Sequence, residues 1–105
     1  MRRLIAAFAL TLVFAGPVSA QPHCTLTVQA ISTLLRWGEN VVDEETRPAA
    51  GHPDILVHWQ VWANPITGSW TFIGTVGVKT CLFAATRRGY DGSHTVSSFL
   101  DGSPA

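Results

Sequence analysis

The segment from residue 54 to residue 68 constrains the fold of this chain more than any other, because it joins a strand pattern to a turn pattern. Apolar and polar residues alternate over residues 54–63, and the segment is rich in β-branched and aromatic types, as in a half-buried β-strand. Residues 64–68 then have turn chemistry, with Pro65 suited to the first corner and Gly68 to a left-handed position. The two patterns predict a β-hairpin and a positive φ at Gly68.

The length of the turn decides which residues face each other in this hairpin. A loop made of residues 65–68 places Val61 opposite Phe72 and Trp59 opposite Gly74, so the apolar side chains share one face of the sheet. A shift of one residue would move every side chain to the other face and place polar groups among them. The hydrophobic pattern therefore favours the loop of residues 65–68.

A second reversal at residues 77–78 leads into a third strand over residues 79–86. The expected pairs are Gly74 with Cys81, Phe72 with Phe83 and Trp70 with Ala85. Before the hairpin, residues 26–37 show helical apolar spacing and end at Gly38, which predicts a short amphipathic helix. Residues 40–53 show neither period and are expected to form a surface connection.

The predicted fold class is α+β, with one N-terminal helix packed on a three-stranded antiparallel β-meander after a cleaved signal peptide. We expect the helix to cover the inner face of the sheet, which carries Trp59 and Val61 and toward which Cys81 points.

The first part of the chain has the pattern of an export signal. Two arginines precede an apolar run over residues 4–15, and small residues at 18–20 suit a signal peptidase. The run is shorter than the roughly 20 residues of a membrane span. We expect cleavage after Ala20, a periplasmic or secreted location and no stable membrane anchor after cleavage. The predicted parts are a signal peptide (1–20), a small α+β domain (21–90) and a largely flexible tail (91–105).

Export places the two cysteines, Cys24 and Cys81, where a disulfide can form and persist. Their bond would close a long loop, which in the chain-entropy model stabilises the fold by about 4 kcal/mol. A redox or metal-binding pair is the alternative, although the sequence lacks the C-x-x-C spacing of such sites. We predict the disulfide.

The charge pattern argues against partners that need a basic surface. Charged residues make up 13% of the chain and the acidic and basic residues balance, so we expect no nucleic-acid binding. Arg87 and Arg88 are interpreted as charges at a strand end that block edge pairing; the alternative is that they and Tyr90 bind a phosphate or stack on a sugar or base.

Motifs for catalysis or metal binding are absent from the sequence. The histidines are scattered without metal-ligand spacing, and no serine has a G-x-S-x-G setting. The acidic residues of the connection are expected to be solvated: Glu39, Asp43, Glu44 and Glu45. We predict no catalytic, cofactor-binding or metal-binding residue and no enzyme activity. A small envelope hydrolase that uses His58 with an acidic partner is an alternative.

Trp62 does not fit the predicted core, because it lies on the outer face of the sheet. That face carries Leu56, Trp62, Ile73 and Leu82. Exposed together, these side chains would form a surface that binds another protein or a second copy of the chain. The alternatives are that residues 93–100 cover the face, or that Trp62 and Tyr90 serve a cell-wall or carbohydrate-binding module.

Three elements occur together in residues 27–85: an aromatic-Gly-Glu step at residues 37–39, a W-x-N-P-x-T-G-x-W hairpin at residues 62–70, and a cysteine strand at residues 81–84. In this combination the chain resembles a group of small uncharacterised exported (periplasmic) proteins of Gram-negative bacteria. That group has no assigned activity, so the resemblance implies the location and the hairpin alone. The expected function is that of a small secreted or periplasmic non-enzymatic binding or accessory protein.

Overall fold

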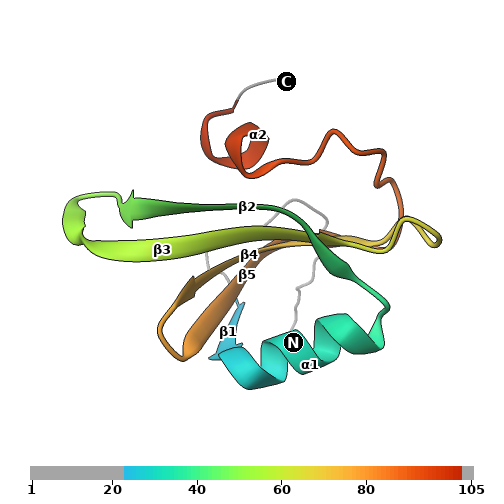
Figure 1. Ribbon diagram of the computed structural model, residues 1–105, viewed down its shortest axis with the longest axis horizontal. Helices are drawn as coiled ribbons and strands as arrows, with labels where there is room; N and C mark the ends of the chain where they lie inside the picture. Colours follow the sequence, from blue (N-terminus) through green and yellow to red (C-terminus); the bar gives the residue numbers. More distant parts are fainter. Residues whose placement is uncertain (1–22, 103–105) are drawn as a thin grey trace, which may run out of the picture.

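The computed structural model describes residues 23–102 and contains an antiparallel five-stranded sheet with one helix on each face (Figure 1). The strands are β1 (His23–Leu26), β2 (Asn40–Ala49), β3 (His52–Ala63), β4 (Trp70–Val76) and β5 (Lys79–Thr86). The helices are α1 (Thr27–Arg36) and α2 (Val96–Leu100). The strand order is β1-β5-β4-β3-β2. The predicted signal peptide, residues 1–20, and its cleavage site lie outside the described residues.

The predicted fold class is wrong, because the sheet has five strands instead of three and carries two short helices instead of one. The expected surface connection is β2, which pairs with β3 along most of its length. Its charged residues and Pro48 hide the strand pattern, yet an edge strand tolerates both because one side of its backbone meets solvent. The other added strand, β1, has 4 residues, too few to show alternation.

The structure confirms the register of the first hairpin, in which Val61 pairs with Phe72 and Trp59 with Gly74. Gly68 has a φ of 84°, as predicted for the turn. The second hairpin follows the prediction as far as Gly74 and Cys81, and a β-bulge then shifts its register. Beyond the bulge the predicted pairs are wrong, since Phe72 pairs with Ala84 and Trp70 with Thr86.

The predicted N-terminal helix covers the opposite face of the sheet from the one expected, and a second helix covers the expected face. Helix α1 packs Leu34 against Trp62 and Ile73, the face expected to be open. Helix α2 covers the aromatic face, where Val96 packs with Val61 and Phe72. Figure 1 shows α1 and α2 on opposite sides of the sheet. Each face of the central strands is covered by a helix, which explains why both faces are apolar.

Polar contacts hold α2 on its face of the sheet. Its N-terminus has a capping box formed by Thr95 and Ser98. The backbone N–H of Val96 donates to Asp43 Oδ2 of β2 at 2.8 Å. Arg47 Nη1 of β2 lies 2.7 Å from Asp101 Oδ1 at the end of the helix. The described part of the predicted tail thus contains a helix that is joined to β2.

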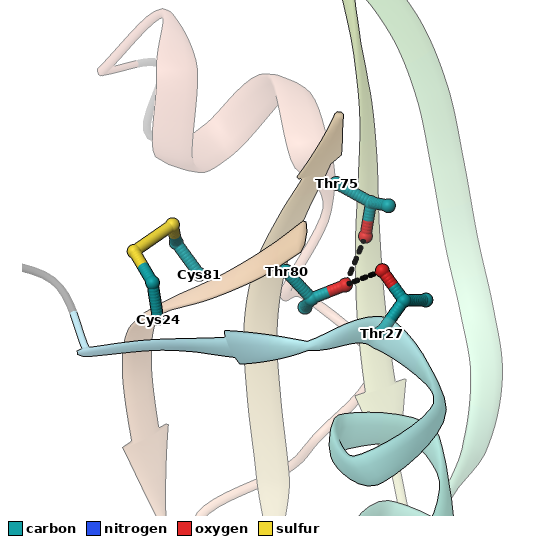
Figure 2. The surroundings of a disulfide bond; sticks show 5 residues. All are labelled: Cys24, Thr27, Thr75, Thr80 and Cys81. Atoms are coloured by element: carbon teal, nitrogen blue, oxygen red, sulfur yellow. Dashed lines mark hydrogen bonds between the residues drawn. A yellow bond between two sulfur atoms is a disulfide. The ribbon is translucent and has the colours of Figure 1, made fainter. Parts of the chain in front are cut away.

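The disulfide between Cys24 and Cys81 is present, as predicted, and joins β1 to β5 (Figure 2). A chain of hydroxyl groups lies beside it: Thr80 Oγ1 donates to Thr27 Oγ1 at 2.9 Å and lies 2.8 Å from Thr75 Oγ1. Because Thr80 is buried, these bonds satisfy a group that would otherwise be costly to bury. They fix the start of α1 against the sheet.

Candidate functional site

Two adjoining cavities lie on the α1 face of the sheet. The first has a volume of about 310 Å³ and lies between α1, β1 and β5, with Leu34 and Thr80 in its wall. The second, the Glu39 cavity, has a volume of about 460 Å³. Its lining residues are Trp37, Glu39, Ser69, Thr71, Ala85, Thr86 and Arg87. Trp37 lines both cavities, so the side chain at the end of α1 separates them.

The C-terminus of α1 places Glu39 in this cavity. The N–H of Gly38 donates to the carbonyl of Leu35 at 3.0 Å, and the N–H of Glu39 donates to that of Leu34 at 3.0 Å. These two bonds, with a φ of 74° at Gly38, make a Schellman motif. The motif ends the helix and turns the chain toward the sheet, so Glu39 enters the cavity instead of facing solvent.

The turn of the β3–β4 hairpin supports the same helix end. Asn64 Nδ2 donates to the carbonyl oxygen of Trp37 at 3.1 Å. Asn64 Oδ1 accepts from the N–H of Ile66 at 2.9 Å, so one side chain holds both the turn and the helix terminus. The asparagine of the hairpin motif therefore positions Trp37 and, two residues later, Glu39.

The Glu39 side chain is buried and its carboxylate lacks partners. The residue is 1% exposed, and neither carboxylate oxygen has a hydrogen-bond partner among the described residues. Burial raises the pKa of the carboxyl above its ordinary value, and the hydroxyls of Thr71 and Ser69, which lie near it without the geometry of a hydrogen bond, lower it in part. Thr71 Oγ1 is also buried without a partner in the described part of the chain. Such groups are rare in folded proteins and often mark functional sites.

We expect Gly38→Ala to destabilise the protein by about 2 kcal/mol or more, because both the backbone and the packing oppose a side chain there. A Cβ at this position would lie 2.7 Å from Asn64 Nδ2, and the φ of Gly38 is left-handed. Gly51→Ala is the matched control, since its φ is 79° and a Cβ there meets nothing within 4 Å. Chemical denaturation measures both variants, and equal losses would show that the contact with Asn64 contributes nothing.

The predicted partner surface is not an open surface. Trp62 and Ile73 are 6% and 1% exposed beneath α1, contrary to the expectation that both face solvent. Leu82 is half-buried in the wall of the first cavity, and Leu56 is exposed. Burial of Trp62 also takes that residue away from a carbohydrate-binding surface shared with Tyr90. The sequence cannot show this, because α1 covers a face that its own apolar spacing does not identify.

The structure does bring His58 to an acidic partner. His58 Nε2 lies 2.8 Å from Glu44 Oε1, and His58 Nδ1 lies 3.0 Å from Thr46 Oγ1. Hydrogen bonds from Gln60 and then from His58 lower the pKa of Glu44. These side chains lie on the exposed surface of β2 and β3, where water competes for every contact. The arrangement has the connectivity of a hydroxyl–imidazole–carboxylate triad without its burial.

Glu39 is the residue that the sequence misplaces, because its neighbourhood of acidic residues predicts a solvated side chain and the structure buries it. Those acids contact other groups: Asp43 binds the N-terminus of α2, and Glu45 Oε1 lies 2.7 Å from Arg47 Nε. The signal for Glu39 is its position directly after the glycine that ends the helix, where the Schellman motif directs the chain inward.

No group of three or more His, Cys, Asp or Glu side chains suited to a metal ion occurs within residues 23–102. In the same region, no helix has the length and apolarity to cross a membrane. Comparison of the chain with protein-family models, with curated proteins and with solved structures found no match. The resemblance to small periplasmic proteins therefore stays a prediction.

Proposed function

We propose that this chain is a small exported, non-enzymatic binding protein whose ligand occupies the Glu39 cavity. The observation that carries the proposal is the Glu39 carboxylate, which is buried in a cavity wall with both oxygens unpartnered within the described residues. A buried acceptor without a donor costs about 1–3 kcal/mol, and more when it is charged. A ligand that donates to Glu39 recovers this free energy on binding.

The composition of the cavity supports a binding role. Trp37 is half exposed at the opening and offers an aromatic wall, while Ser69 and Thr71 offer hydroxyl groups. A concave site with aromatic lining and a few convergent polar groups is the usual form of a small-ligand site. The disulfide is consistent with an oxidising, exported environment.

A ¹⁵N-labelled sample titrated with pentylamine, pentanamide, pentanol and pentanoate tests this function. We expect at least one probe to shift the amide signals of Glu39 and Thr71 and the indole N–H of Trp37. Glu39→Gln should weaken that binding, whereas Glu44→Gln, the same change at an exposed carboxylate, should leave it unchanged. The proposal is wrong if no probe shifts these signals, or if the shifts map to the α2 face around Trp59.

We expect Glu39→Gln to stabilise the ligand-free protein by about 1 kcal/mol at pH values above the pKa of Glu39, because the amide there removes a charge from a buried site. In the wild type the pKa of Glu39 is raised, which means that folding favours the protonated carboxyl. The wild type therefore loses stability as the pH rises through the pKa of Glu39, and the variant does not. Urea denaturation of both proteins from pH 4 to pH 8 measures the difference, which should widen toward high pH. A difference independent of pH would contradict the assignment.

A further inference from the structure

We propose that the ligand of the Glu39 cavity is a primary amine that carries an anionic group at its other end. This claim rests on the proposed binding function and names the chemical class of the ligand.

The unpartnered acceptors in the cavity match the donors of an ammonium group. Three buried oxygens lack partners among the described residues: Glu39 Oε1, Glu39 Oε2 and Thr71 Oγ1. A primary ammonium has three N–H donors and no acceptor. A carboxamide has two donors and brings a carbonyl oxygen, whereas a guanidinium has five donors in a rigid plane and would leave some unpaired. Of the three groups, the ammonium alone has as many donors as there are unpartnered oxygens and brings no acceptor of its own.

The charge of the site favours the same group. Glu39 forms no ion pair with any described residue, and burial opposes its ionisation. A ligand ammonium would supply the missing counter-charge, and charge-assisted hydrogen bonds are about twice as strong as neutral ones. The Trp37 ring at the opening can pack along the aliphatic part of the ligand or face its cation.

Arg87 indicates what the other end of the ligand carries. It lines the same cavity, is exposed, and forms no ion pair within residues 23–102. A single cavity thus presents a buried carboxylate and, separately, a guanidinium suited to a carboxylate or phosphate. A purely cationic ligand would be repelled by Arg87, so an anionic group at its outer end makes both charges favourable.

Titration of the disulfide-bonded protein with 5-aminopentanoate, pentylamine and pentanoate, followed by NMR, tests this class. The three probes have chains of similar length and differ in their charged ends. We expect 5-aminopentanoate to bind tightest, pentylamine to bind more weakly by about threefold, and pentanoate to bind weakest. In the wild type, the affinity for both amines should fall as the pH drops through the pKa of Glu39, because the protonated carboxyl no longer pairs with a cation.

Variants separate the two ends of the ligand. Glu39→Gln should lower the affinity for both amines by about tenfold. Glu44→Gln is the control and should leave these affinities unchanged. Arg87→Gln should lower the affinity for 5-aminopentanoate by about threefold and leave the affinity for pentylamine unchanged or slightly higher. Arg88→Gln, a change at the exposed neighbour that does not line the cavity, is the control for Arg87.

Different results would overturn the ammonium assignment, the anionic end and the proposed function. Pentanoate binding as tightly as pentylamine would overturn the ammonium assignment. Equal binding of the two amines, or no effect of Arg87→Gln, would overturn the anionic end while the ammonium assignment stands. If neither these probes nor the neutral pentanol and pentanamide bind in the cavity, the proposed function itself fails.

Discussion

Trp62→Ala is expected to destabilise the protein by about 3–5 kcal/mol, the usual cost of removing a large aromatic side chain from a core. Trp62 is 6% exposed and packs with Leu34 of α1 and Ile73 of β4. Its Nε1–H also donates to Gln60 Oε1 at 3.0 Å. The substitution therefore leaves a cavity between α1 and the sheet and removes a hydrogen bond. Urea denaturation followed by far-UV circular dichroism measures the loss.

Trp37→Ala is the matched control for this prediction, because Trp37 is 50% exposed at the other end of the same interface. We expect it to cost less than about 1 kcal/mol, in the range of surface changes, while it weakens ligand binding. A loss of stability below about 1 kcal/mol for Trp62→Ala would instead indicate that this tryptophan is exposed and would contradict the packing of α1.

Replacing Cys24 and Cys81 together by serine is expected to cost about 2–5 kcal/mol and to lower Tm strongly. The two cysteines are 57 positions apart, so their bond constrains most of the unfolded domain. Among the strands of residues 23–102, β1 pairs only with β5, over 4 residues. Without the disulfide we expect this short strand to separate first, and the start of α1 to loosen with it.

Differential scanning calorimetry of the double variant, compared with the wild type with and without reductant, measures this effect. The reduced wild type should match the variant, because both lack the same cross-link. Two freely alkylated thiols in the unreduced wild type, seen by mass spectrometry, would show that the bond does not form and would remove the basis of the prediction.

Local patterns in the sequence predict the local structure well. The alternation in β3 and the turn at Asn64–Gly68 determine the hairpin register, because a shift of one residue would exchange the two faces. The spacing of apolar residues before Gly38 predicts α1 within a residue or two of its ends. The presence of two cysteines in a chain with an export pattern predicts the disulfide.

The arrangement of these elements depends on contacts that no local pattern contains. Both faces of β3 and β4 are apolar, so the sequence does not say which face α1 covers. The bulge between Phe72 and Ile73 shifts the register of β5, and the facing residues of β5 contain no glycine or proline that would indicate it. Strand β2 looks like a connection because its charges face solvent and α2, and pairing with β3 alone makes it a strand.

The candidate site depends on the same long-range contacts. From sequence, Glu39 is one acid among several in a charged segment. It becomes a buried, unpartnered carboxylate only when the helix end, held by Asn64 of the β3–β4 turn, brings it beside Thr71. The glycine-glutamate step at the end of α1 is the one local clue, and it specifies a direction of the chain, not a ligand.

The pKa of the Glu39 side chain, measured by ¹³C NMR of its carboxyl carbon with and without 5-aminopentanoate, tests directly whether this buried carboxylate binds an amine. We predict a pKa above the ordinary value for glutamate in the free protein, because the carboxyl is buried without a partner among the described residues. Binding of the amine should lower it, since an ammonium group stabilises the carboxylate. An ordinary pKa that the probe does not change would contradict both the buried, unpartnered state of Glu39 and its role in binding.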